Sequence, residues 1–130
     1  MKTILLIEDT IEILENLTEY LELEGYKILG TNNGKQGIKL AGEFIPHLII
    51  CDVRMREMDG HEVLRSLLEM SNTKEIPFIF STSLSERINR AEAINLGADD
   101  YIIKPFEPET LLRMAKTWIQ SGSKRHRMIF

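Results

Sequence analysis

The chain has 130 residues, of which 43% are hydrophobic and 28% are charged, and its formal net charge at pH 7 is −4. These values are typical of one ordinary globular domain, and the negative charge argues against nucleic-acid binding by this chain alone. No apolar run is long enough to span a membrane, and the N-terminus lacks the features of a signal peptide. The single cysteine excludes an internal disulfide, so we expect a reducing, cytoplasmic environment.

Short apolar runs alternate with segments whose apolar residues recur at helical spacing. The predicted strands, in chain order, are Thr3–Ile7, Tyr26–Gly30, His47–Asp52, Pro77–Phe80 and Tyr101–Ile103. The predicted helices are residues 11–24, 35–44, 60–70, 85–96 and 108–119. Helix-boundary residues support these limits, with N-cap types at Thr10 and Ser85, terminating glycines at Gly25 and Gly97, and a first-turn proline at Pro108. The residues from Ser121 to Phe130 show no clear pattern.

Five alternations of strand and helix predict an α/β fold with a parallel sheet and helices on both of its faces. The run from His47 to Asp52 reads as the most buried strand, because it is continuously apolar and then ends on a carboxylate. Ligands of such sheets bind just outside the carboxyl ends of the strands. Asp52 therefore occupies a position where chemistry is expected.

Other predicted strands also end on polar residues of complementary chemistry. The set comprises Glu8, Asp9, Asp52, Thr82 and Lys104. Three carboxylates brought together repel one another and require a compensating cation, and their hard oxygen atoms suit Mg²⁺. A carboxylate can act as a nucleophile toward phosphorus, and a metal, an ammonium group and a hydroxyl could neutralise the phosphoryl oxygens. The strand ends together fit phosphoryl transfer to an aspartate.

Each of these residues also has an ordinary structural interpretation. Glu8 and Asp9 could be solvated loop residues, and Asp52 could be a turn acid. Thr82 could belong to a turn or a helix cap, Lys104 could be an exposed surface lysine, and Cys51 is best read as a small buried hydrophobic residue. Their occurrence at the same end of one sheet favours the functional interpretation.

Ordered motifs spread over residues 2–119 resemble the response regulator receiver domain of two-component signalling. The motifs are Ile7-Glu8-Asp9, Leu48-Ile49-Ile50-Cys51-Asp52, Met55, Met58-Asp59-Gly60, Pro77–Thr82, Gly97-Ala98-Asp99-Asp100-Tyr101 and Lys104-Pro105-Phe106. The resemblance implies a flavodoxin-like three-layer sandwich with a five-stranded parallel sheet in the order 2-1-3-4-5 and five helices. It assigns residues 1–120 to the receiver domain and residues 121–130 to a tail or the start of a linker.

The same resemblance implies a role for each matching residue. Asp52 would accept a phosphoryl group from a phosphohistidine of a sensor histidine kinase or phosphotransfer protein. Mg²⁺ would be held by the carboxylates of Glu8, Asp9 and Asp52 and by the backbone carbonyl of Arg54. Thr82 and Lys104 would contact phosphoryl oxygens, and the Lys104-Pro105 peptide would be cis. The domain would be a switch that catalyses only its own phosphorylation and dephosphorylation.

Thr82 and Tyr101 would form the conformational switch, with the ring of Tyr101 turning inward as Thr82 moves toward the phosphate. The face made by the last two helices and the Tyr101 strand would then bind a partner or a second copy of the chain. Glu8 stands where many members of the family have aspartate, but it remains an oxygen ligand. Arg54 and Leu84 occupy the two variable positions that influence phosphate lifetime, and we hypothesise that Leu84 shields the aspartyl-phosphate from water.

Three alternatives to the switch differ from it in the residues that they require. A nucleotide- or flavin-binding domain of the same fold would need a glycine- or hydroxyl-rich phosphate loop after the first strand, whereas this chain has Glu8-Asp9-Thr10 there. An aspartate-nucleophile phosphatase would need a second acid where the chain has Arg54. The remaining alternative is a degenerate receiver that serves as a phosphorylation-independent adaptor. Retention of the acidic residues, Thr82 and Lys104 argues against it.

Overall fold

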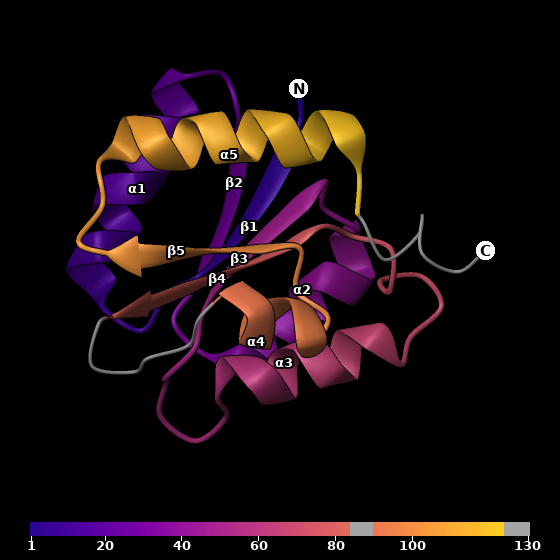
Figure 1. Cartoon of the computed structure of the whole chain (residues 1–130). Helices are drawn as coiled ribbons and strands as arrows, with labels where there is room; N and C mark the ends of the chain where they lie inside the picture. Colours follow the sequence, from indigo (N-terminus) through magenta and orange to yellow (C-terminus); the bar gives the residue numbers. More distant parts are fainter. Residues whose placement is uncertain (84–89, 124–130) are drawn as a thin grey trace.

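The computed structural model describes residues 1–83 and 90–123, in which strands and helices alternate (Figure 1). The strands are β1 (Thr3–Ile7), β2 (Lys27–Thr31), β3 (Leu48–Asp52), β4 (Phe78–Ser83) and β5 (Asp100–Lys104). The helices are α1 (Ile11–Leu23), α2 (Gly34–Phe44), α3 (Gly60–Leu68), α4 (Arg90–Asn95) and α5 (Pro108–Ser121). The predicted alternation is confirmed. The predicted cap Ser85 lies outside the described residues.

The strands form one parallel sheet in the order β2-β1-β3-β4-β5, as predicted. All five residues of β3 are buried, which agrees with its unbroken apolar sequence and its central position. Helices α1 and α5 cover one face of the sheet, and α2, α3 and α4 cover the other (Figure 1). The fold is therefore the flavodoxin-like three-layer sandwich.

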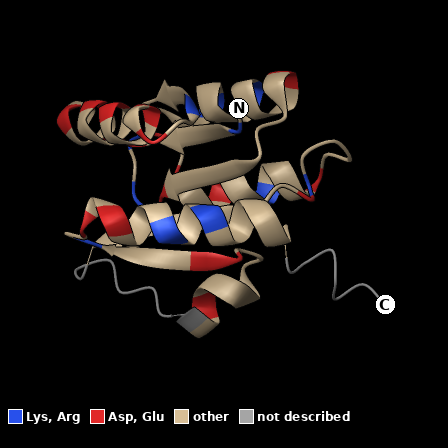
Figure 2. Ribbon diagram, turned by 90° about the horizontal axis from the view of Figure 1, so that it is seen from above, with Lys and Arg blue, Asp and Glu red and all other residues tan. Residues whose placement is uncertain are grey.

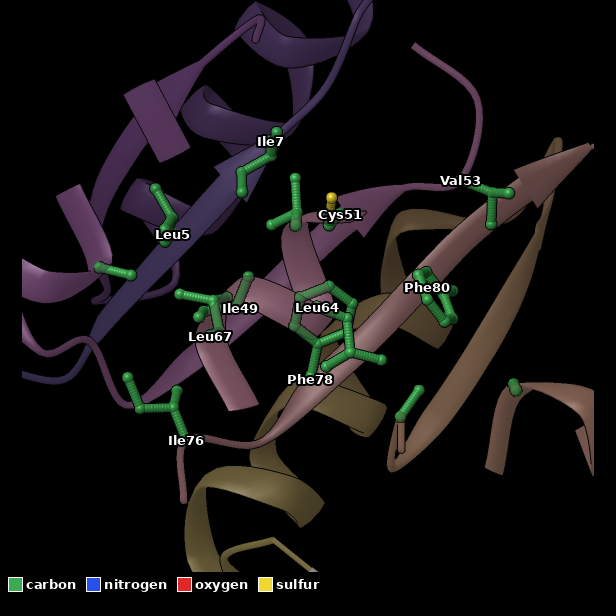
Figure 3. Packing of buried hydrophobic residues seen from close by; sticks show 14 of the residues in the cluster. Leu5, Ile7, Ile49, Cys51, Val53, Leu64, Leu67, Ile76, Phe78 and Phe80 are labelled. Atoms are coloured by element: carbon green, nitrogen blue, oxygen red, sulfur yellow. The ribbon is translucent and has the colours of Figure 1, made fainter. Parts of the chain in front are cut away.

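Each face of the sheet has its own hydrophobic core. On the side of α2, α3 and α4, side chains of alternate strand positions pack against α3 (Figure 3). Here the rings of Phe78 and Phe80 pack edge to face, with their centroids 5.1 Å apart. On the other side, Leu17 and Leu21 of α1 and Leu111, Ala115 and Trp118 of α5 cover the remaining strand positions. Strand residues alternate between the two cores because successive side chains point to opposite faces.

Two glycines allow the helices of the first core to approach the sheet closely. A Cβ atom on Gly60, at the start of α3, would lie 2.2 Å from the backbone oxygen of Asp52. A Cβ atom on Gly37 of α2 would lie 2.4 Å from Cδ1 of Ile7. The clash at Gly60 is with backbone, so the backbone that carries Asp52 depends on this glycine, whereas a Cβ atom on Gly37 would meet the end of the flexible Ile7 side chain.

The C-terminal end of α5 departs from the prediction. Ser121 is helical, and the side chain of Ser123 is buried, with its hydroxyl donating to Oδ1 of Asp99 over 2.8 Å. The other carboxylate oxygen of Asp99 accepts from the amide of Phe78 at 2.9 Å, so Asp99 joins the start of β4 to the chain after α5. The absence of pattern predicted from Ser121 onward is therefore wrong for residues 121–123.

Thr10 is the N-cap residue of α1, as predicted, although its side chain makes no capping hydrogen bond. The Thr10 amide donates to Oε2 of Glu8. In α4, Ala93 is buried whereas Ala91 and Ile94 are exposed, and Leu96, just after the helix, is exposed as well. Among the described residues, no helix is both long and apolar enough to cross a membrane.

Candidate phosphoacceptor site

The site lies at the edge of the sheet where the strands end. Because the sheet is parallel, Glu8 after β1, Asp52 at the end of β3 and Lys104 at the end of β5 reach this same edge. Asp52 and Glu8 are only 3% and 4% exposed. Buried carboxylates require partners of opposite charge or hydrogen-bond donors, so the groups around them define the site.

Lys104 supplies the opposite charge. Its Nζ lies 2.8 Å from Oδ1 of Asp52, 3.1 Å from Oε1 of Glu8 and 3.2 Å from Oε2 of Glu8. The lysine belongs to β5, which is separated from β3 by β4 in the sheet, so its long side chain bridges the end of one strand to reach Asp52. One ammonium group therefore contacts two buried carboxylates, and the cluster carries a net negative charge when both are ionised.

Backbone amides before α1 complete the partners of the two carboxylates. The Asp9 amide donates to Oδ2 of Asp52 over 2.8 Å, and the Thr10 amide donates to Oε2 of Glu8 over 3.0 Å. Asp9 therefore contacts Asp52 through its backbone amide. Within the described residues, no three His, Cys, Asp or Glu side chains already converge as metal ligands.

The surroundings raise the pKa of the Asp52 carboxyl from 3.8 to about 7. Burial is the main cause, followed by a hydrogen bond to Glu8 and by the negative charge of Glu8. Hydrogen bonds from Lys104 and from the Asp9 amide act in the opposite direction. The pKa of Lys104 is itself raised, because the charges of Asp52 and Glu8 outweigh its burial.

The loop between β3 and α3, which follows Asp52, is held by internal hydrogen bonds. The Gly60 amide donates to the Val53 carbonyl over 2.7 Å, and the side chains and amides of Asp59 and Glu62 form a capping box at the start of α3. Glu57 adopts a left-handed conformation with φ 64°. The side chain of Arg54 points to solvent, so only its backbone is placed near Asp52.

Thr82 lies next to the site on β4. It is 1% exposed and follows Ser81, the residue paired with Asp52, and its hydroxyl donates to the Ser83 carbonyl over 3.3 Å. Tyr101 pairs with Phe80 one strand further on and packs, partly buried, against the α2–α4 core. The predicted switch residues thus lie on adjacent strands. Leu84 lies outside the described residues.

Two features of the site escaped the sequence reasoning. The direct contact between Glu8 and Lys104 depends on the length and conformation of both side chains, and the spacing of residues in the sequence does not predict these. Ile13, Asn16 and Leu17 of α1, together with Phe106, line a cleft beside Lys104. The Lys104-Pro105 peptide is cis, as the family resemblance implied.

Comparison with known proteins agrees with this geometry. The family model "Response regulator receiver domain" matches residues 4–116. The response regulator SaeR of Staphylococcus aureus is 33% identical over 127 residues, which cover 97% of this chain and 54% of SaeR. The chain therefore spans about half the length of that curated relative.

Two solved structures of receiver domains from histidine kinases are also similar. One, from Syntrophus aciditrophicus, is 33% identical, with a TM-score of 0.83 and coverage of 92% of this chain and 91% of that one. The receiver domain of the sensor kinase PA1611 from Pseudomonas aeruginosa is 28% identical, with a TM-score of 0.79 and coverage of 92% and 98%, and holds magnesium in its active-site cleft. Fold, motif order and family match agree: the chain belongs to the response regulator receiver domain family.

Proposed function

We propose that this domain is a phosphorylation-activated switch in which Asp52 accepts a phosphoryl group from a phosphohistidine of a sensor kinase or phosphotransfer protein. The observation that carries the proposal is the buried Asp52 carboxylate at the end of β3, 2.8 Å from the ammonium group of Lys104. A carboxylate held beside a cation at the end of a parallel strand is suited to attack phosphorus.

The transfer forms a bond between a carboxylate oxygen of Asp52 and phosphorus as the bond between phosphorus and the imidazole nitrogen breaks. The imidazole leaves with the bonding electron pair. Lys104 and the Asp9 amide favour the ionised form of Asp52, which is the nucleophile. As the phosphoryl group arrives, Lys104 and the Thr82 hydroxyl pair with two of its oxygens.

The oxygen donors beside Asp52 fit a magnesium ion. Glu8 and Asp52 share a single ammonium group, so the cluster can take additional positive charge. Glu8, Asp9, Asp52 and the backbone carbonyl of Arg54 would hold Mg²⁺ once Lys104 moves from the carboxylates toward the phosphate. Bound Mg²⁺ would supply positive charge to the phosphoryl oxygens.

The output of the switch is a change in partner binding. Movement of Thr82 toward the phosphate frees space beside β5, and Tyr101 turns into it, which alters the face formed by α4, β5 and α5. Ile94, Leu96 and Ile103 on this face are 38–41% exposed, which supports docking of a partner or a second copy there. We place the domain in the cytoplasm, where a sensor kinase would present its phosphohistidine.

Binding of beryllium fluoride, which mimics an aspartyl-phosphate, tests the proposal. Trp118 is a suitable fluorescent reporter, since its indole N–H donates to Asp100 of β5 over 3.1 Å. We expect saturable binding that requires Mg²⁺, is lost in Asp52→Asn and is kept in Asp59→Asn, a control at the start of α3. No response in the wild type would overturn the proposal in favour of a phosphorylation-independent adaptor.

A further inference from the structure

Strand β2 comes first in the strand order, so β1 lies on one side of it and its other side is an edge of the sheet. On the inner side, the Thr31 carbonyl accepts from the Glu8 amide over 3.0 Å. The backbone groups of successive strand residues point to opposite sides, so the amides and carbonyls of Ile28 and Gly30 point away from β1. No strand of the described part of the chain lies along this edge. The edge therefore offers backbone donors and acceptors to a further strand.

A groove of about 490 Å³ lies beside this edge, between α1 and β2. It is lined by Leu14, Glu15, Thr18, Glu19, Glu22 and Gly30. Gly30 is exposed and has no side chain, and a Cβ atom at this position would lie 3.2 Å from Cδ1 of Leu14. The backbone of Gly30 is therefore open to a partner, with the apolar side chain of Leu14 next to it.

The α1 wall of the groove is acidic. Acidic residues recur along α1 (Figure 2), and Glu15, Glu19 and Glu22 are exposed and spaced so that they lie on one side of the helix. Helix α1 contains no lysine or arginine. Within residues 1–83 and 90–123, no basic side chain forms an ion pair with these three carboxylates. The groove therefore favours a cationic partner.

An extended basic peptide matches both the open edge and the acidic wall. We propose that the edge of β2 and this groove bind a partner segment in which Lys or Arg alternates with β-branched residues. Its backbone pairs with Ile28 and Gly30 as a sixth strand, and its basic side chains contact the glutamates. Side chains on one face of a strand are about 7 Å apart, and Glu15 to Glu22 span about 10 Å along α1, so two alternate basic residues reach all three carboxylates. The surface does not include Asp52, so binding does not require phosphorylation.

A second copy of the chain fits the same edge less well. Antiparallel pairing of two β2 strands about a twofold axis would place both α1 helices on the same face of the joined sheet. The two acidic walls would then lie close together, and like charges oppose association. The charge of the groove therefore favours a basic peptide over another molecule of this protein.

Fluorescence polarisation of a labelled peptide tests the proposal on the intact, unphosphorylated chain. The probe is a short peptide of alternating lysine and valine, and we expect saturable binding that weakens as the salt concentration rises. Two control peptides should not bind: one has glutamate in place of lysine, and one keeps every lysine but carries a methyl group on each backbone nitrogen. In the complex, the amides of Ile28 and Gly30 should become protected from hydrogen exchange.

Two substitutions at Gly30 form a matched pair. Gly30→Pro removes an amide that points away from β1, so the pairing with β1 is kept, and we expect the peptide to bind about 10-fold more weakly. Gly30→Ala keeps the amide and places its methyl group against the flexible end of Leu14, so the affinity should stay within about threefold of the wild type. Circular dichroism checks that both variants are folded.

Glutamine substitutions test the acidic wall without altering β2. Glu15→Gln, Glu19→Gln and Glu22→Gln together should weaken binding about 10-fold, as the loss of three surface ion pairs would give. The control variant removes the same charge from exposed positions elsewhere. It combines Glu43→Gln, Glu69→Gln and Glu109→Gln, and should bind as the wild type does.

The proposal is overturned if the lysine–valine peptide does not bind, or if its methylated form binds equally well. It is also overturned if folded Gly30→Pro or the variant of the acidic wall keeps the wild-type affinity, or if the exchange protection appears elsewhere. Dimerisation in analytical ultracentrifugation that Gly30→Pro abolishes would assign the edge to a second copy instead. None of these measurements involves Asp52, so failure here is distinct from failure of the phosphoacceptor role.

Discussion

Replacement of Lys104 by methionine should destabilise the protein in a pH-dependent manner. The change removes the ammonium group that contacts both Asp52 and Glu8 and leaves two buried carboxylates without their cation. The side chain of Lys104 is 23% exposed, and those of the carboxylates are 4–5% exposed. The ion pairs are therefore largely shielded from water, and their loss costs more stability than the loss of an ion pair on an open surface.

The sign of the pH dependence follows from Asp52. Its pKa in the folded protein, about 7, is raised above the ordinary value, so its protonation stabilises the fold at low pH and this stabilisation is lost as pH rises through 7. Without Lys104 the pKa of Asp52 rises further, because Lys104 lowers it in the wild type. Between pH 7 and the higher pKa that Asp52 has in the variant, each pH unit adds about 1.4 kcal/mol to the loss of folding free energy caused by Lys104→Met.

We expect Lys104→Met to lower the free energy of unfolding by about 1–2 kcal/mol at pH 5.5 and by roughly 1.4 kcal/mol more at pH 8, where the total approaches the range for a broken buried ion pair. Urea denaturation of both proteins without metal, followed by circular dichroism, measures the difference. Lys116→Met, at an exposed position of α5, is the control and should be neutral at both pH values. An equal loss at pH 5.5 and pH 8 would refute the coupling between Lys104 and ionised Asp52.

Three further changes test other parts of the account. Carbon-13 NMR of the Asp52 carboxyl should give an apparent pKa near 7 in the metal-free protein, and Glu8→Gln should lower it, because the charge of Glu8 opposes ionisation. An unchanged titration would contradict that cause. Ser123→Ala should cost about 1–2 kcal/mol by chemical denaturation, since it removes a buried hydrogen bond to Asp99; a neutral result would mean that this contact contributes nothing. Gly60→Ala should displace the backbone at Asp52, because the added Cβ would lie 2.2 Å from its carbonyl oxygen, and unchanged amide shifts around β3 would exclude this effect.

The architecture was predictable because its signals are local and repeated. The apolar run before Asp52 has no polar position, as expected of a strand covered on both faces, and β3 is indeed buried throughout. The strand order came from the family resemblance, since alternation alone predicts a parallel sheet without specifying which strands are neighbours. The proximity of Glu8, Asp52 and Lys104 was predictable because parallel strands end at the same edge of the sheet.

Details that depend on side-chain conformation were not predictable. Thr10 has the right type for an N-cap and occupies that position, yet its side chain makes no capping hydrogen bond. Ser123 has no periodic apolar neighbours to mark it as ordered, and it is buried because Asp99, 24 residues earlier, offers a carboxylate. In α4, Ile94 is exposed although it is strongly hydrophobic, so hydrophobicity alone does not identify the core residues of this helix. Interactions between distant polar groups leave no pattern in the sequence.

The account rests on Asp52 as the residue that carries the phosphoryl group, and chemical trapping tests this most directly. The wild-type chain would be treated with phosphoramidate and Mg²⁺, reduced with borohydride, which converts an aspartyl-phosphate to homoserine, and mapped by mass spectrometry. We predict homoserine at position 52 in the wild type and no modification in Asp52→Asn. Homoserine at another aspartate, or unmodified Asp52 in the folded wild type, would contradict the account.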